Sequence, residues 1–190
     1  MVKGVVKLKS KLDYILSQHA DEARFAATDI KIKIWLYLGL YQLIYLDSIP
    51  AHAAINETVK LAKENLGDKV GDFVNAMLRS WQREPEVVYP TDPVQRIACE
   101  HSYPPELIEH WIDLWGEEDA EYLAIWFNEN PKLHMRVNGT ATTPEKLIQY
   151  FAKRDIKVTP SPVGKMTLLT EEADSVLDDV AFSEGYFSIQ

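Results

Sequence analysis

Hydrophobic residues recur at helical spacing through the first half of the chain. Val5, Leu8, Leu12, Ile15 and Leu16 follow the three- and four-residue intervals of one face of an amphipathic helix. Residues 30–46 are apolar nearly all round, which is typical of a helix at the centre of a bundle. We therefore expect the N-terminal part of the chain to be a helical bundle.

Two more helices complete the expected bundle. The first begins at Pro50, a residue that the first turn of a helix tolerates, and ends before Gly67. The second begins with Asp68 as its cap and continues to Arg83, with apolar residues along one side. The segment 84–92 is rich in proline and has the composition of a linker.

The hydrophobic period changes in the second half of the chain. Helices are expected over 94–100, 104–116 and 117–130, and then a period of two begins. Leu133, Met135 and Val137 alternate with Lys132, His134 and Arg136, which predicts a half-buried strand. A helix opened by Thr143-Pro144-Glu145 should follow, with further strands expected at 156–158, 166–169 and 186–189. The predicted protein is mainly α, with a helical bundle over 1–90 and a helical connector plus a small α/β unit over 91–190.

Charge is divided unevenly along the chain. The formal net charge is −9, which taken alone argues against a nucleic-acid partner. Residues 1–83 nevertheless carry 12 basic and 9 acidic side chains, and residues 131–165 carry 7 and 2. The acidic excess lies in 84–130, where Arg96 faces 12 acids, and in 166–190, which holds 6 acids and no base. Nucleic acid responds to local potential within about 10 Å, so the two basic segments keep RNA open as a partner.

Composition also narrows the cellular setting. The single cysteine, Cys99, excludes an intramolecular disulfide and suits a reducing compartment. The longest apolar stretch, Ile34 to Leu46, is too short to span a bilayer. We expect a cytoplasmic protein without a membrane partner.

Catalytic motifs are absent from the sequence. It contains no glycine-rich nucleotide motif and no H-E-x-x-H. Glu106 and His110 lie four residues apart, with His101 nearby, but a surface pair is the better interpretation, and no metal site is expected. Cys99 and His101 do not share a helix face, so a buried structural cysteine is favoured over a nucleophile.

The tryptophans and asparagines of the helices each allow two interpretations. Trp111, Trp115 and Trp126 occur at apolar helical positions, so core packing is favoured over stacking on bases. Asn56 and Asn75 lie among apolar residues, where a buried amide needs a hydrogen bond. We favour a bond that fixes helix register, with contact to an RNA base as the second interpretation.

An ordered run of segments resembles the start of the Sun/Fmu family of ribosomal RNA cytosine-5 methyltransferases. The matching segments are Leu38–Glu57, Phe73–Arg79, His101–Pro104, Leu133–Asn138 (similar to the family's L-R-V-N strand) and Phe182–Gln190. Together they cover the chain from about residue 4 to residue 190. A NusB-family antitermination factor would share the first part but not the segment from His101 onward.

The resemblance implies a NusB-like domain over 1–90 and, within 91–190, the RRM-like α/β unit that precedes the catalytic domain. Family members carry further helices upstream and continue into a Rossmann-type domain that binds S-adenosylmethionine and holds the catalytic cysteines. We expect that domain to be missing from this chain, and Cys99 matches neither catalytic cysteine. We therefore expect no catalytic residue, no bound S-adenosylmethionine and no activity of this chain alone.

The resulting hypothesis is a module that binds small-subunit ribosomal RNA and positions it for cytosine-5 methylation. Structural roles are expected for the polar residues His52, Asn56, Glu57 and Asn75. The expected phosphate contacts are Lys3, Lys7, Lys11, Arg79, Arg83, Lys132 and Arg136. Four or five such contacts would give a salt slope of about −3.

The alternatives are a NusB-type antitermination or protein-interaction module, which would dock a ribosomal or transcription protein, and an active standalone enzyme. Charge reversal of the basic faces distinguishes RNA binding from the first alternative, because it should abolish RNA binding and leave protein docking largely intact. Binding of S-adenosylmethionine discriminates the second.

Overall fold

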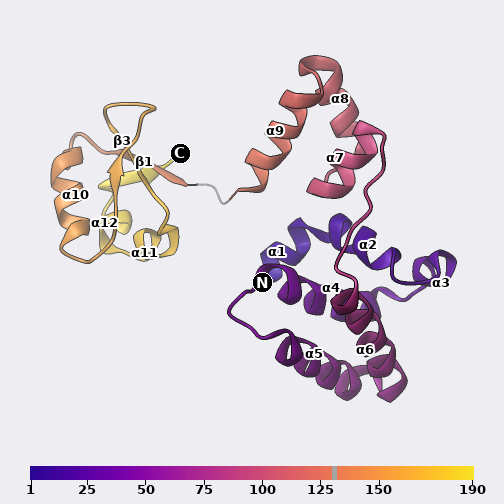
Figure 1. Ribbon diagram of the computed structural model, residues 1–190. Coiled ribbons are helices and arrows are strands. Elements are labelled where there is room, and N and C mark those ends of the chain that lie inside the picture. The colour runs from indigo at the N-terminus through magenta and orange to yellow at the C-terminus, as the bar shows by residue number, and fades with distance from the viewer. Residues whose placement is uncertain (130–131) are drawn as a thin grey trace. The chain divides into compact units, whose positions relative to one another are not determined.

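The computed structural model describes residues 1–129 and 132–190, without the side chains of residues 22 and 24. The described chain divides into two compact units, residues 1–128 and 129–190, and each has its own core (Figure 1). The mainly α fold class is confirmed. The sequence predicts a domain boundary near residue 90. The division into compact units does not test that boundary, which stays a prediction.

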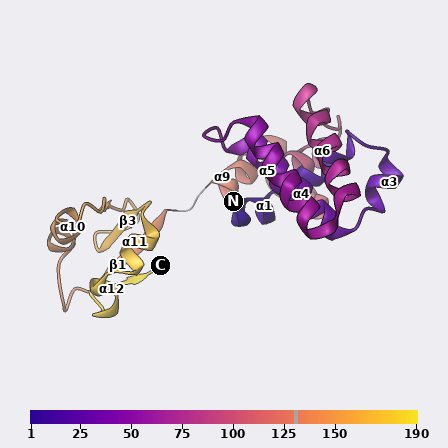
Figure 2. The same cartoon turned by 90° about the horizontal axis from the view of Figure 1, so that it is seen from below.

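Six helices form the bundle at the start of the first unit. They are α1 (Val2–Lys7), α2 (Lys9–Ser17), α3 (Glu22–Ala26), α4 (Ile30–Tyr45), α5 (Ala51–Leu66) and α6 (Asp68–Arg83). Helix α4 contacts α1, α2, α5 and α6, which explains why its sequence is apolar nearly all round (Figure 2). The predicted central helix is therefore confirmed.

Two details of the bundle differ from the prediction. The first amphipathic stretch is interrupted at Leu8, whose backbone (φ −101°, ψ 19°) ends α1 and precedes α2. Asp68 is the first residue of α6 and not its cap, because Gly67 takes the cap position with a φ of +91°. Only glycine adopts that left-handed backbone without strain, so Gly67 both ends α5 and begins α6.

Three helices follow the extended segment 84–92. They are α7 (Pro93–His101), α8 (Pro105–Trp115) and α9 (Glu117–Asn128). Their small core contains Ile97, Ala98, Ile108 and Ala124. Helix α7 also contacts α2 of the bundle, where the Ser102 hydroxyl accepts a hydrogen bond from the Ser10 amide at 2.9 Å. The last predicted position of the 117–130 helix lies outside the described residues.

The second unit is a four-stranded antiparallel sheet with helices. Its elements are β1 (Leu133–Val137), α10 (Pro144–Ala152), β2 (Thr159–Pro160), β3 (Thr167–Thr170), α11 (Ala173–Leu177), α12 (Val180–Ser183) and β4 (Phe187–Ile189). The strand order β2-β3-β1-β4 with antiparallel neighbours is the arrangement of a split β-α-β, ferredoxin-like unit. The expected strand at 156–158 lies instead at 159–160. Val158 is buried in the core, and the left-handed backbone of Asp155 (φ 61°) ends the preceding turn.

The alternation predicted for β1 is confirmed. Met135 and Val137 are buried against Leu147 and Phe151 of α10, while Arg136 is exposed. Val176 of α11 and Ala181 of α12 join the same core. The short helices α3, α11 and α12 were not predicted, because five or fewer residues do not display a helical period.

Candidate nucleic-acid interface

The three N-terminal lysines differ in their surroundings. Lys3 is exposed and forms no ion pair with any described residue. The Lys7 ammonium donates a 2.6 Å hydrogen bond to the Asn128 carbonyl at the end of α9, where a cation complements the helix dipole. Lys11 is half-buried, and this burial lowers its pKa, while the Glu100 carboxylate opposes the shift. Two of the three lysines therefore contribute to contacts between α1 or α2 and the helices that follow the bundle.

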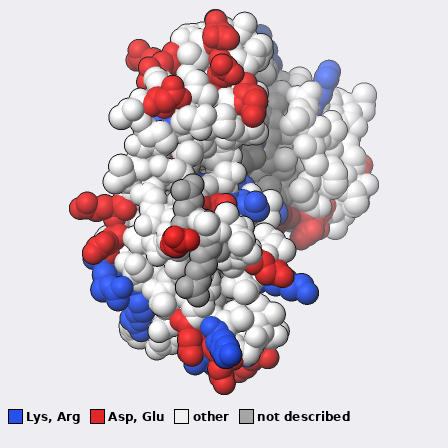
Figure 3. All heavy atoms as spheres, turned by 90° about the vertical axis from the view of Figure 1, so that its right-hand side faces the viewer, with Lys and Arg blue, Asp and Glu red and all other residues white. Residues whose placement is uncertain are grey.

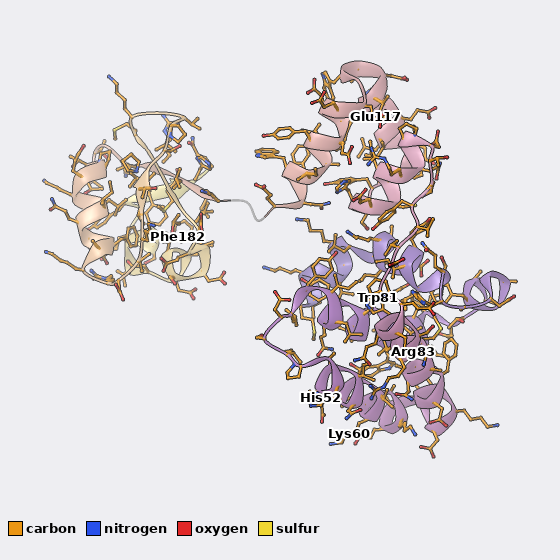
Figure 4. The ribbon with its side chains drawn as sticks, in the orientation of Figure 1. His52, Lys60, Trp81, Arg83, Glu117 and Phe182 are labelled. Carbon is orange, nitrogen blue, oxygen red and sulfur yellow. The ribbon has the colours of Figure 1, made fainter. Side chains whose placement is uncertain are left out.

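The two arginines of α6 are placed at its last turns. Arg79 Nη1 donates to Gln82 Oε1 at 3.0 Å, and Nη2 lies 3.5 Å from Asn56 Oδ1 on α5. Arg83, labelled in Figure 4, is exposed and has no ion pair within the described ranges. It lines a hollow of about 430 Å³ together with His19, Glu84 and Glu86.

The four polar residues with expected structural roles lie at the surface. Asn56 and Asn75 are exposed, as are His52 and Glu57 (His52 in Figure 4). Neither asparagine amide is buried, because both helix faces are turned to solvent although their sequence neighbours are apolar. Asn56 still reaches α6 through the long contact with Arg79, so a register-fixing role for it stays a prediction.

Lys132, just before β1, and Arg136, within β1, differ in their surroundings. Lys132 forms an exposed ion pair of 3.1 Å with Glu171. Arg136 has no ion pair and no side-chain hydrogen bond to any residue that the structure describes, and it extends from the sheet face opposite to the buried Met135 and Val137. Its guanidinium is therefore available to an external anion.

A network around Arg96 was missed by sequence reasoning. Arg96 of α7 contacts both carboxylate oxygens of Glu121 at 2.6 and 2.7 Å and reaches Glu117, at the start of α9 in Figure 4, at 3.1 Å. The hydrogen bond from Arg96 lowers the pKa of Glu121. The only signal in the sequence was that Arg96 is the single base among 12 acids of residues 84–130.

The same network contains three groups with metal-ligand chemistry. One ligand atom from each of Glu100, His101 and Glu121 lies within 4.8 Å of the other two. The Arg96 guanidinium already contacts both carboxylates, at 3.5 Å for Glu100. Burial lowers the pKa of His101 and so favours the neutral ring, while the Glu100 and Glu121 carboxylates act in the opposite direction. A guanidinium in this position supplies the positive charge that a metal ion would bring, and the arrangement is a structural ion-pair network.

The tryptophans of α8 and α9 correct a second expectation. Trp111 is partly buried and contacts Tyr103 and Phe127 by ring packing at 5.5 and 6.0 Å. Trp115 and Trp126, however, are 53% and 54% exposed, so core packing is wrong for both. The interface between the helices is formed by the small residues Ala120 and Ala124, which leaves the large side chains outside.

The surroundings of these exposed aromatic residues are acidic. Glu117, Glu118 and Asp119 occupy the first turn of α9, and Figure 3 shows acidic side chains gathered over the α8–α9 hairpin. Repulsion of phosphate by this charge disfavours a nucleic-acid contact there. Among the predicted phosphate contacts, the exposed and unpaired ones are Lys3 and Arg83 in the first unit and Arg136 in the second.

No helix in the described part of the chain is long and apolar enough to cross a membrane.

Comparison with known proteins agrees with the two-part organisation. The NusB family model matches residues 1–83, and the ferredoxin-like domain model of RsmF/B-like methyltransferases matches residues 103–176. A crystal structure of a protein named PH0851 has a TM-score of 0.67 over 98% of this chain and 42% of its own, at 16% identity, which supports the fold alone.

Curated relatives align over the whole chain. The probable ribosomal RNA small subunit methyltransferase B of Bacillus subtilis is 37% identical over 100% of this chain and 42% of its own length. Its counterpart of the same name from Synechocystis sp. is 31% identical over 100% and 43%. With both domain models matched in order, the chain belongs to the Sun/Fmu family of ribosomal RNA small subunit methyltransferases B and spans about 42% of the length of these relatives.

Proposed function

We propose that this chain is the RNA-binding portion of an S-adenosylmethionine-dependent small-subunit rRNA (cytosine-5) methyltransferase, in which it positions rRNA for methylation. The relatives are named as small-subunit rRNA methyltransferases, and the NusB and ferredoxin-like matches cover most of the chain. The proposed domains are the NusB-like bundle of residues 1–90 and the connector plus α/β unit of residues 91–190.

The availability of particular cations carries the proposal. Lys3, Arg83 and Arg136 are exposed, and within the described ranges none of them is neutralised by an ion pair. A phosphate backbone would release counterions on meeting such groups without first breaking a protein contact. Lys7, Lys11, Arg79 and Lys132 have contacts within the protein and would add less. The acidic segment 84–130 would limit non-specific binding.

The described residues do not fit S-adenosylmethionine. Nucleotide-like cofactors of open α/β sheets sit at the carboxyl ends of parallel strands, next to a glycine-rich turn into a helix. Here every strand pair is antiparallel, and the turn from β1 to α10 contains the single glycine Gly139. We propose that methyl transfer requires the remaining length of the longer relatives and that this chain alone is inactive.

The antitermination alternative is not favoured. The relatives named above are methyltransferases, and the second family model covers residues that a NusB factor would not share. A ribosomal or transcription protein as partner stays a proposal. Charge reversal at Arg83 and Arg136 would separate the two functions, because it should weaken RNA binding and leave a protein contact largely unchanged.

The test is the salt dependence of RNA binding. The full chain would be titrated against a labelled small-subunit rRNA fragment at several KCl concentrations, with fluorescence anisotropy as the readout. Three phosphate contacts predict a slope of log K against log salt of about −2 on single-stranded RNA, and each further contact adds about 0.7. Binding that ignores salt, or no binding at all, would refute the proposed function.

A further inference from the structure

The sheet of the α/β unit has one covered face and one open face. Met135, Val137, Leu168 and Phe187 point into the core that α10, α11 and α12 complete. The neighbouring positions Arg136 and Ser188 are paired across β1 and β4, and both are exposed. The open face therefore presents a guanidinium beside a hydroxyl, at the pair that Arg136 and Ser188 form across β1 and β4.

A cleft of about 530 Å³ opens next to Arg136. Three segments that are distant in sequence build it: the end of β1, the turn before β3 and the turn before β4. Its lining includes Arg136, Asn138, Gly139, Met166, Gly185 and Ser188. The volume lies in the range of small-ligand sites and accommodates one nucleotide.

Asn138 ties the walls of the cleft together. Its backbone amide donates to the Tyr186 carbonyl at 2.8 Å, and its side-chain amide donates to the Gly185 carbonyl at 2.9 Å. Its side-chain oxygen accepts from the Thr140 hydroxyl at 2.7 Å. The cleft is thus held open by hydrogen bonds before any ligand arrives, which reduces the entropy lost on binding.

The lining combines features that suit a nucleotide. The Arg136 guanidinium can make two parallel hydrogen bonds to a phosphate, and it has no competing carboxylate among the described residues. Met166 is 39% exposed and offers a polarisable apolar surface for the flat face of a base. The acid of the adjoining turn, Glu184, is engaged with the Tyr186 hydroxyl, whose pKa it raises.

The shape of the site selects between paired and unpaired RNA. A recess in the protein surface receives a group that protrudes, whereas the bases of an A-form duplex are stacked and their major-groove edges are inaccessible. The geometry points to a site for one unpaired nucleotide of single-stranded RNA, with Arg136 on its phosphate and Met166 against its base. This inference rests on the proposed RNA-binding function and locates it in the α/β unit.

The test compares variants of the full chain in anisotropy titrations with a labelled 12-nucleotide single-stranded RNA. Arg136→Ala should weaken binding about tenfold and reduce the salt slope by about 0.7. Arg136→Lys should restore the slope but only part of the affinity, because lysine lacks the paired donors. Asn138→Ala should weaken binding several-fold at an unchanged slope, since it removes no charge. Circular dichroism would confirm that each variant is folded.

The matched control is Lys146→Ala on α10, which removes an exposed cation from the same unit but outside the cleft lining. It should leave affinity within about twofold. Equal losses from Lys146→Ala and Arg136→Ala, or unchanged binding in both cleft variants, would overturn the inference while leaving RNA binding in place. Failure of the wild-type chain to bind any RNA would overturn the proposed function together with the inference. A blunt 12-base-pair duplex that competes as well as the single strand would refute the inference of an unpaired nucleotide and leave the proposed function standing.

Discussion

At the scale of single residues, the surroundings of a charged side chain decide its role. Seven basic residues were candidates for phosphate contact, yet Lys7 caps a helix end, Lys11 is half-buried and Lys132 is paired with Glu171. Arg96, in contrast, lies in the most acidic segment and links α7 to α9 through its carboxylate contacts. A cation that already has a partner inside the protein must break that contact to bind phosphate, so it adds less to the affinity for RNA.

Replacing Arg96 with alanine should lower the free energy of unfolding by about 1–2 kcal/mol at neutral pH, because Glu121 and Glu117 lose their partner in a partly buried setting. The pKa of Glu121 is lowered in the folded chain, so its stabilising contribution is present above its ordinary value of 4.5 and is lost as the pH falls through the folded pKa. The difference between variant and wild type should therefore shrink below pH 4.5. Urea unfolding at a series of pH values measures it.

The control for this experiment is Gln95→Ala, an exposed neighbour on the same helix, which should change stability by less than about 0.5 kcal/mol. A loss in Arg96→Ala that stays constant down to pH 3 would contradict the role given to the carboxylates.

At the scale of elements, small residues set how closely helices approach. Gly39 of α4 is buried, and a methyl group added to it would overlap the side chain of Leu78 on α6. Gly71 of α6 is also buried, but a methyl group there would meet the aliphatic part of Lys63, a side chain that is 38% exposed. We therefore expect these two buried helical glycines to differ in how well they tolerate alanine.

We expect Gly39→Ala to destabilise the chain by about 1–3 kcal/mol, since the fully buried Leu78 has no space to move into. Gly71→Ala should cost less than Gly39→Ala, because the partly exposed Lys63 can turn away at the expense of its exposed ion pair with Asp72, and alanine favours the helix. Thermal and urea unfolding of the two variants measure the difference. A Gly39→Ala variant as stable as Gly71→Ala would show that the contact between α4 and α6 is looser than described.

The tryptophans separate core from surface in the same way. Trp81→Ala should cost about 3–5 kcal/mol, because Trp81 is buried in the bundle core and packs edge-on against His19. Trp115→Ala and Trp126→Ala should each cost less than about 1 kcal/mol in this chain, since half of each ring is already in water. Urea unfolding compares the three. A loss near that of Trp81→Ala at either exposed position would mean that its ring is covered in solution.

At the scale of the whole molecule, basic and acidic side chains are concentrated on different elements. Among the candidate phosphate contacts, the exposed and unpaired cations Lys3, Arg83 and Arg136 belong to α1, α6 and β1, while the α8–α9 hairpin is acidic and carries exposed aromatic rings. The family relatives are more than twice as long as this chain. The proposed RNA contacts lie on exposed cations, and the described strand pairs are all antiparallel, without the parallel-strand edge at which open α/β sheets hold dinucleotide-type cofactors.

Titration of this chain with S-adenosylmethionine should produce no saturable heat in calorimetry, because the described sheet lacks the parallel strands and the glycine-rich turn of such sites. RNA added to the same sample serves as the positive control for a folded, competent chain. A saturable heat with one site per chain would contradict the proposal that methyl transfer needs the rest of the longer relatives.

The sequence by itself determined the mainly α fold class, the central helix α4, the bounds of most long helices and the faces of β1. These follow from local periodicity, which reports a residue's face within its own element. The short helices and the position of β2 were not predicted, since a few residues show no period. Their placement depends on tertiary packing: Phe25 of α3 belongs to the bundle core, and Val176 of α11 and Ala181 of α12 belong to the core of the second unit.

Only the tertiary structure decided which cations stay free and which rings stay outside. Arg136 and Lys132 belong to one alternating pattern, and the position of Glu171 on a segment more than thirty residues away separates them. Trp126 has the spacing of a core residue, but Ala120 and Ala124 fill the helix interface instead. Pairing and exposure depend on neighbours that are remote in sequence, and no local pattern records them.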